Sequence, residues 1–217
     1  MRYTNQEKVD RRWSPNLAYA IGLITADGNL HPDGRHMHFV SKDKELVLNL
    51  EAALGISNRI SKRGRGGDPT KRYYYINFGD KIFYGFLNKL GLTSAKSKTI
   101  KSVYVPDIYF QHFVRGLFDG DGTFYTSWDK RWPSSFLYQI AFASASKSFI
   151  DWFKNRLTEL YSVKGVLCKG DGVYNLRYVK GDSFRLYLIM YPDNAGLLFL
   201  ARKYNKISHA LKFDGKI

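Results

Sequence analysis

The chain has 217 residues, 44% of them hydrophobic, which is enough for a sizeable core in one domain or in two small ones. Its 34 Lys and Arg against 19 Asp and Glu give a formal net charge of +15. This charge favours a polyanionic partner, because neutralising phosphates releases counterions, but ribosome-binding and acidic-membrane-binding proteins stay open. The single cysteine, Cys168, excludes an internal disulfide and a zinc cluster of cysteines.

The N-terminal residues 1–12 are polar and charged and lack the apolar core of a signal peptide. The longest apolar run, residues 17–26, has about half of the ~20 residues that a membrane-spanning helix needs. We therefore expect an intracellular protein that is not secreted and has no membrane partner. A bacterial or archaeal cytoplasm and the interior of an organelle both fit this expectation.

The first half of the chain predicts the order helix, two strands, helix, two strands, helix. Ser14 suits the N-cap of the first helix and Pro15 its first position, and the helix ends at Asp27-Gly28. Alternation of apolar and polar residues and the turn residues between them predict the strands, and apolar residues at helical spacing predict the helices. The elements that follow are a hairpin of residues 29–31 and 35–41, a helix over 42–54, strands over 58–65 and 72–78, and a helix over 80–90.

The second half repeats this order. Pro106-Asp107 opens a helix that again ends in Asp-Gly, at Asp121-Gly122. The elements that follow are a hairpin of residues 123–128 and 135–144, a helix over 146–161, strands over 163–168 and 173–179, a helix over 183–190, and an added helix in the tail 194–204. The repeat indicates an internal duplication. We predict an α+β fold of two pseudo-symmetric αββαββα halves, residues 1–92 and 107–217 with a C-terminal helix, joined by the connecting segment 93–106.

The two Asp-Gly helices carry small residues four positions apart, Gly22 with Ala26 and Gly116 with Gly120. One turn of helix places each pair on one face, which leaves a flat stripe. Two helices with such stripes can bring their backbones unusually close. We therefore expect the halves to pack through these helices as one body, with the sheets forming a saddle.

Packed in parallel, the two helices would deliver Asp27 and Asp121 to the same end of the pair. Each carboxylate meets the negative end of a helix dipole, and the two repel, so the arrangement is unfavourable unless a cation is bound. Oxygen ligands with room for water suit Mg2+, and such a centre suits phosphodiester hydrolysis. A single Asp-Gly after a helix is most often an ordinary C-terminal stop, but two matching copies favour the metal site.

The segments 20–28 (AIGLITADG) and 114–122 (VRGLFDGDG) resemble the motif of the LAGLIDADG homing endonuclease family in its single-chain, two-motif form. The resemblance covers nearly the whole chain. It implies that Asp27 and Asp121, with the backbone carbonyls of Ala26 and Gly120, bind the metal. The departures from the motif are Thr25 at an acidic position, Gly120 in place of Ala, and Arg115 in an otherwise apolar helix.

The resemblance also implies an activity. We expect a monomeric, intron-encoded, site-specific endonuclease that cuts both strands of a long asymmetric duplex DNA and leaves short 3′ overhangs. Mg2+ is the expected cofactor, Mn2+ a substitute, and Ca2+ an ion that binds without supporting cleavage. Two alternatives remain open: a splicing cofactor that binds its host intron RNA, and a DNA-binding regulator that has lost cleavage.

Lysines are the expected cations beside the reacting phosphate, where they stabilise developing charge or orient water. Lys96 follows the last helix of the first half, and Lys203 lies at the matching point of the second, so both resemble the active-site lysines of the family. Lys98 and Lys206 are further candidates close by. The family often has Gln at the end of its second strand, where this chain has Lys42 in one half and Ala145 in the other.

The period of two along the strands predicts which polar side chains face away from the helices. Arg, Asn and Gln on such a face match base edges in the major groove, although a polar strand face is normally just solvated. We expect phosphate contacts at the hairpin tips 63–71 and 129–132. The residues predicted to bind DNA are Asn29, His36, His38, Arg59, Ser61, Arg63, Arg65, Tyr73, Tyr75, Asn77, Thr123, Tyr125, Ser127, Lys130, Arg131, Gln139, Lys164, Asn175 and Arg177.

Overall fold

The computed structural model describes residues 8–65, 68–192 and 195–217. The chain divides into two compact units, one of Met1–Lys96 with Val103–Gly120 and the other of Ser97–Ser102 with Asp121–Ile217. Each αββαββα half that the sequence predicts is present, so the α+β fold class is confirmed. The compact units differ from the predicted halves in one element, because the helix of the second motif groups with the first unit.

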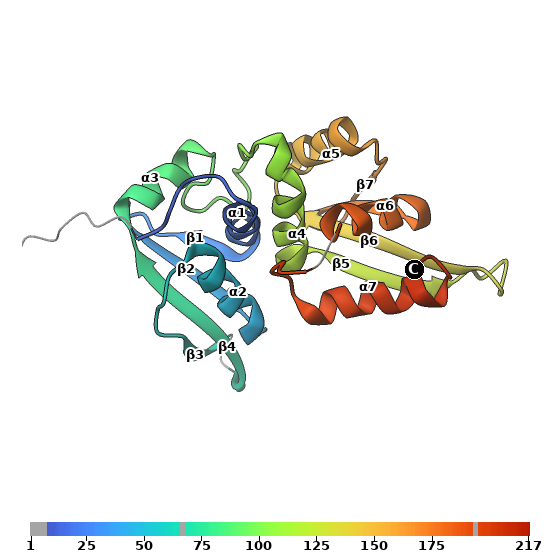
Figure 1. The fold of residues 1–217 in the computed structure, drawn as a ribbon, viewed down its shortest axis with the longest axis horizontal. Coiled ribbons are helices and arrows are strands. Elements are labelled where there is room, and N and C mark those ends of the chain that lie inside the picture. The colour runs from blue at the N-terminus through green and yellow to red at the C-terminus, as the bar shows by residue number, and fades with distance from the viewer. Residues whose placement is uncertain (1–7, 66–67, 193–194) are drawn as a thin grey trace, which may run out of the picture. The chain divides into compact units, whose positions relative to one another are not determined.

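The first half forms one antiparallel sheet with helices on one of its faces (Figure 1). Its strand order is β1-β2-β4-β3, so the two central strands come from different hairpins. The core lies between the sheet and the helices, with Phe39, Ile76 and Leu50 almost completely buried. The elements are α1 (Pro15–Asp27), β1 (Gly28–Leu30), β2 (His36–Ser41), α2 (Lys44–Leu54), β3 (Ser61–Arg65), β4 (Asp68–Gly79) and α3 (Lys81–Lys89).

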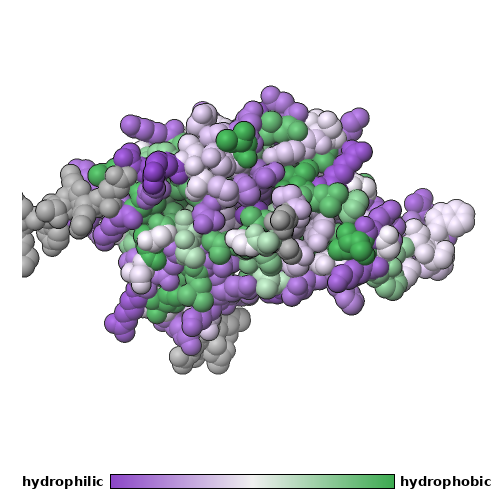
Figure 2. All heavy atoms as spheres, in the orientation of Figure 1, coloured by the Kyte–Doolittle hydropathy of each residue, from purple (hydrophilic) through white to green (hydrophobic). Residues whose placement is uncertain are grey.

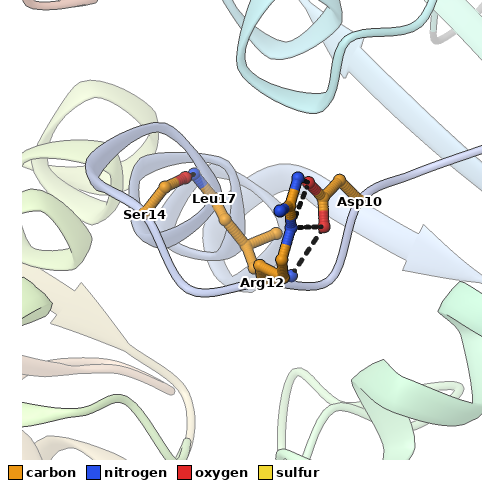
Figure 3. A network of polar contacts seen from close by, with 4 residues as sticks. All are labelled: Asp10, Arg12, Ser14 and Leu17. Atoms are coloured by element: carbon orange, nitrogen blue, oxygen red, sulfur yellow. Dashed lines mark hydrogen bonds and ion pairs between the residues drawn. The ribbon is translucent and has the colours of Figure 1, made fainter.

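Helix α1 begins as its sequence predicts. The Ser14 hydroxyl accepts a hydrogen bond of 3.1 Å from the Leu17 backbone N–H (Figure 3). Pro15 is the first helical residue. Just upstream, the guanidinium of Arg12 pairs with the Asp10 carboxylate at 2.6 Å. That pair is exposed and stabilises the fold little. The N-cap bond satisfies a backbone donor that the helix itself leaves unpaired, which makes the start of α1 well defined.

The second half repeats the arrangement, with strand order β5-β6-β8-β7 (Figure 1). A single 3-10 turn, Asp107–Tyr109, precedes its first helix, so the α-helix begins a few residues later than the sequence predicts. Helix α5 packs on β6 and β8, and Phe142 meets Phe153 with ring centroids 4.9 Å apart. The elements are α4 (Phe110–Asp121), β5 (Thr123–Trp128), β6 (Phe136–Ser144), α5 (Lys147–Tyr161), β7 (Val166–Lys169), β8 (Tyr174–Val179), α6 (Lys180–Met190) and α7 (Ala201–Phe213).

The C-terminal helix lies further along the chain than the predicted 194–204. Gly196 has a φ of +74°, in the left-handed region, and this conformation is incompatible with a helix running through it. Helix α7 starts at Ala201 and buries Ile207, Ala210 and Leu211, which share one helical face. It packs along β5, the edge strand of the second sheet. The helix therefore covers backbone N–H and C=O groups that an edge strand would otherwise expose.

The surface mixes hydrophilic and hydrophobic residues on the face drawn in Figure 2. Among the described residues, no helix is both long enough and apolar enough to cross a membrane.

Candidate active site

Helices α1 and α4 meet backbone to backbone through their glycines. A Cβ placed on Gly22 would lie 2.3 Å from the Phe113 carbonyl oxygen, and one placed on Gly116 would lie 2.1 Å from that of Tyr19. Real side chains essentially never approach backbone atoms this closely, so glycine is required at both positions. The flat stripes predicted from the sequence therefore do face each other.

The close contact between α1 and α4 continues to the acidic ends of the two motifs. A Cβ on Gly120 would lie 2.3 Å from the Ala26 Cβ and 3.3 Å from a carboxylate oxygen of Asp27. Asp27 is the last residue of α1 and half-buried, and Asp121 follows Gly120 as the exposed last residue of α4. Both helices thus end in a hard oxygen donor at the negative end of the helix dipole.

The oxygen donors at each motif end fit Mg2+ or another hard divalent cation. Carboxylate and carbonyl oxygens suit such ions, and Mg2+ usually retains several waters and takes only one or two carboxylates from the protein. Among the residues that the structure describes, no group of three or more His, Cys, Asp and Glu side chains could hold a metal by itself. A metal bound by a motif aspartate would therefore complete its shell with water and substrate oxygens.

Each half places one lysine against the carbonyl that follows its motif aspartate. The Lys96 ammonium donates to the Gly28 carbonyl, and the Lys203 ammonium donates to the Gly122 carbonyl at 2.6 Å. Lys96 is buried, with 6% of its surface exposed, and the preceding Ala95 has a φ of +54°. The left-handed backbone of Ala95 turns the chain directly before the buried Lys96. The two lysines therefore occupy corresponding positions in the two halves.

The other candidate lysines differ from this pair. Lys206 donates to the Phe124 carbonyl at 2.8 Å, two residues beyond the Gly122 carbonyl that Lys203 binds. Lys98 is exposed. Lys42 is also exposed and lies over the Tyr73 ring, with its nitrogen 5.7 Å from the ring centroid. Lys203 and Lys206 thus bind carbonyls at the motif end and on the edge strand β5.

A buried polar network that joins the two motif helices was missed by sequence reasoning. The Tyr19 hydroxyl donates to the Asp119 carboxylate at 2.7 Å, and the fully buried Arg115 guanidinium lies 5.3 Å from the Tyr19 ring centroid. Burial, together with Asp119, raises the pKa of Tyr19 well above its usual value. The signal in the sequence was the pair Arg115 and Asp119, one helical turn apart in an apolar segment.

His112 belongs to the same network and is neutral. Its Nδ1 lies 3.0 Å from a guanidinium nitrogen of Arg115, which can only donate, so this imidazole nitrogen accepts. Burial, followed by the charge of Arg115, lowers the pKa of His112 to about 4. The helix that carries Asp121 is thus tied to α1 by the Tyr19–Asp119 hydrogen bond as well as by glycine contacts.

The open face of the first sheet is polar, as its alternation predicts. Asn29, His38 and Asn77 are cross-strand neighbours in one row, while Met37 and Phe39 beside them are buried. The other predicted residues with described side chains are placed as follows: Ser61 opposite Tyr75 on β3 and β4, Tyr73 on β4, His36 at the start of β2, and Arg59 exposed before β3. The side chains of Arg63 and Arg65 lie outside the described part of the structure.

One member of the first set is already engaged. The His36 imidazole lies 2.6 Å from the Asp33 carboxylate, which also accepts from two backbone N–H groups of the hairpin turn. These bonds lower the pKa of Asp33. His36 therefore contributes to the turn, and its ring is held at the end of the strand.

The open face of the second sheet is less polar than the prediction implies. Its register brings apolar residues between the polar ones, because Leu137, Ala141 and Val179 share the parity of Gln139 and Arg177 on β6 and β8. The predicted residues are placed as follows: Thr123, Tyr125 and Ser127 on β5, Gln139 on β6, Asn175 and Arg177 on β8, Lys164 exposed before β7, and Lys130 and Arg131 in the β5–β6 turn.

Comparison with known proteins identifies the family. The LAGLIDADG-like domain model matches residues 14–91 and 111–188, which together make up most of the chain and contain one motif helix each. The chain belongs to the LAGLIDADG family. No curated protein matches the chain in sequence.

Solved structures share the LAGLIDADG fold at low sequence identity. The homing endonuclease I-WcaI bound to its DNA recognition sequence has a TM-score of 0.62 and 14% identity, over 90% of this chain and 88% of that one. I-DmoI in complex with DNA and Ca has a TM-score of 0.56 and 16% identity, over 90% and 97%. Full-length DUF199/WhiA from Thermatoga maritima has a TM-score of 0.58 and 16% identity; the alignment covers 97% of this chain and 65% of WhiA.

The departures from the LAGLIDADG motif are accommodated locally. Thr25 returns its hydroxyl to the Ile21 carbonyl within α1, at 2.7 Å, so it needs no partner outside the helix. Gly120 leaves space beside the Asp27 carboxylate, because a Cβ at this position would lie 3.3 Å from a carboxylate oxygen. Arg115 is fully buried beside the Tyr19 ring, so the helix pair encloses one cation.

Proposed function

We propose that this LAGLIDADG protein is a site-specific DNA endonuclease that hydrolyses both strands of a long, asymmetric duplex target with a divalent metal, preferentially Mg2+. The observation that carries the proposal is the matched pair of motif ends. In each half an aspartate closes a glycine-packed helix, and a lysine binds the carbonyl of the next residue. A DNA-binding scaffold alone has no need of this repeated arrangement.

The residues have distinct roles in this proposal. Asp27 and Asp121, with the backbone carbonyls of Ala26 and Gly120, hold the metal, which when bound lowers the pKa of water and stabilises the leaving 3′ oxygen. Lys96 and Lys203 fix the strand that follows each aspartate and keep a positive charge close to the scissile phosphates. The two halves act on the two strands.

Duplex DNA is the proposed partner for two reasons. The net charge of +15 suits phosphate contacts, and the polar open faces of two antiparallel sheets suit the major groove. The relatives I-WcaI and I-DmoI were solved with DNA, which supports the same use of the fold here. A single chain that contains both halves is proposed to act as a monomer.

The second candidate is a LAGLIDADG protein that binds duplex DNA without cutting it. The similarity to WhiA supports this candidate, because it shows that proteins not named as endonucleases share the fold. Both motif aspartates are present in this chain, and a protein that only binds DNA has no use for two repelling carboxylates. The endonuclease is therefore preferred.

The test uses a large randomised duplex library with the wild-type protein, in Mg2+ and separately in Ca2+. We expect cutting at one long site in Mg2+ and binding alone in Ca2+. Asp27→Asn and Asp121→Asn should each abolish double-strand cutting and change duplex affinity by less than about threefold, since the lost charge holds metal and contacts no base.

Asp151→Asn is the matched control, because Asp151 is an acidic helix residue whose partner is Lys147, on α5. This variant should cut like the wild type. Double-strand cutting that survives in either motif variant would refute the assigned centre. Binding without cutting in Mg2+ by the wild type would establish the second candidate, and neither binding nor cutting would direct the test to structured intron RNA.

A further inference from the structure

A hollow lies on the open face of the second sheet, on the half of the molecule built by β5, β6 and β8. Its volume is about 390 Å3, and its lining includes Tyr125, Ser127, Leu137, Gln139 and Val179. These five of the eight lining residues have the same parity along their strands, on the face opposite to the buried Phe124. Thr126 and Tyr138, which also line the hollow, have the other parity. The hollow therefore opens on the face proposed to meet DNA.

The strand register puts one amide in the middle of this hollow. Gln139 pairs with Tyr125 of β5 on one side and with Val179 of β8 on the other. Val179 is 59% exposed and Tyr125 50% exposed, so both present side chains to solvent beside the amide. Leu137 lies two residues along β6 on the same face. Within the described part of the chain, no hydrogen bond occupies the Gln139 side chain.

The first sheet has a different row at its centre. Asn29, His38 and Asn77 are cross-strand neighbours there, and all three carry hydrogen-bonding groups. The second sheet combines one such group with apolar neighbours. The two halves therefore offer different chemistry to the two half-sites of a target.

One base pair matches an amide flanked by apolar side chains. In the major groove adenine shows the N7 acceptor beside the N6 donor, which a Gln amide binds with two hydrogen bonds, and thymine shows its C5 methyl, which favours apolar contact. A guanine would instead favour Arg or Lys. The nearest cation in the lining is Lys180, whose ammonium is bound by Asp214 at 2.7 Å and by the Phe136 carbonyl at 3.0 Å.

We propose that this hollow reads a single A·T base pair in the half-site bound by the second sheet. Gln139 binds the N6 and N7 edge of the adenine, and Val179 and Leu137 contact the methyl group of the paired thymine. This inference rests on the proposed function only in requiring that the open sheet face binds duplex DNA. It does not require that the DNA is cut.

The test measures duplex affinity in Ca2+, with the target found by the library selection. Each thymine of the target is replaced by uracil, one at a time, which removes only the methyl group. We expect a loss of about fourfold at one position, the value of one buried methyl group. Replacing its paired adenine by 7-deazaadenine, which lacks the N7 acceptor, should reduce affinity by about fivefold or more.

Two variants assign these losses to the hollow. In Val179→Ala the uracil penalty at that position should shrink to less than about twofold, because only Leu137 then contacts the methyl group. In Gln139→Ala the 7-deazaadenine penalty should disappear, because the amide that binds N7 is gone. Asn77→Ala, on the first sheet, is the control and should retain both penalties. Matching melting temperatures would show that all three variants fold.

Several outcomes would overturn the proposal. They are uracil penalties that Val179→Ala leaves unchanged, a G·C pair selected at the position that Gln139→Ala affects, and penalties that the Asn77→Ala control removes instead. A protein that binds the duplex but never cuts it would refute the proposed cleavage and still give the affinities that decide this inference. A protein that binds no duplex at all would overturn both.

Discussion

His112 shows how one buried side chain makes the stability of the molecule depend on pH. Its imidazole lies on α4, accepts from Arg115 and is only 7% exposed. Burial and the neighbouring positive charge both penalise a second proton, so the folded protein keeps the pKa of His112 at about 4, against an ordinary value of 6.5. In the unfolded chain neither penalty exists.

We predict that the free energy of unfolding falls between pH 7 and pH 4.5 by about 2 kcal/mol on account of His112 alone. The sign follows from the depressed pKa: the contribution is complete above pH 6.5 and decreases as the pH falls towards 4, because the unfolded chain binds the proton first. Urea unfolding at both pH values measures it, with His112→Gln as the comparison. The carboxylates titrate alike in both proteins, so equal pH dependences would contradict the assignment.

At the scale of secondary-structure elements, the contact between α1 and α4 is what places the motif ends. Its closeness comes from glycines that face backbone atoms of the partner helix, at Gly22 and Gly116. The Tyr19–Asp119 hydrogen bond adds a polar link between the same two helices. The position of Asp27 beside Gly120 thus depends on packing one to two turns away.

We predict that Gly116→Ala destabilises the protein by more than about 3 kcal/mol, because the new Cβ would lie 2.1 Å from a backbone oxygen that cannot move alone. Gly85→Ala is the matched control. It lies inside α3, where an added Cβ would meet nothing within 4 Å, and there alanine should stabilise by about 0.5–1 kcal/mol. Urea unfolding of both variants checks the pair; equal effects would exclude close packing as the reason for Gly116.

At the scale of the whole molecule, the surplus of basic residues dominates. The net charge of +15 is distributed over sheets, turns and helices, so only part of it meets DNA in the proposed complex. Lys130 and Arg131 in the β5–β6 turn are exposed. Lys147 on α5 is exposed as well, but α5 packs on the other face of the sheet.

We predict a steep loss of duplex affinity with salt, at least about tenfold between 50 and 200 mM, since each phosphate contact contributes a slope of about −0.9 on a double-logarithmic plot. Removing both turn cations, with Lys130→Ala and Arg131→Ala together, should reduce the slope by about two. Lys147→Ala should leave it unchanged. A shallow slope in the wild type would contradict phosphate contacts as the main source of affinity.

Local signals in the sequence predicted much of the fold. Ser14-Pro15 and the repeated Asp-Gly ends, together with the two alternating hairpins of each half, were sufficient for the αββαββα order. They also predicted the α+β class, because caps and side-chain periodicity act within a few residues of the chain. The C-terminal helix was misplaced, because its position depends on burial of Ile207 and Leu211 in the second unit.

The candidate site, like the fold, was predicted from the sequence only in part. Asp27, Asp121, Lys96 and Lys203 could be selected from the sequence by duplication and by family resemblance, and their catalytic roles stay predictions. The hydrogen bonds of Lys96 and Lys203 to matching carbonyls, and the network of Tyr19 and Asp119, join residues about 70 to 100 positions apart. No local pattern specifies such partners.

The sequence by itself determined the order of the elements, the duplicated acidic motifs and the excess of positive charge, since each depends on residue type and short spacing. Only the tertiary structure decided that Gly22 and Gly116 face backbone, that Arg115 is buried beside Tyr19, and that apolar side chains flank Gln139. Strand register and helix contact set these neighbours. Both arise from packing over the whole half, where one step of register moves every side chain to the opposite face.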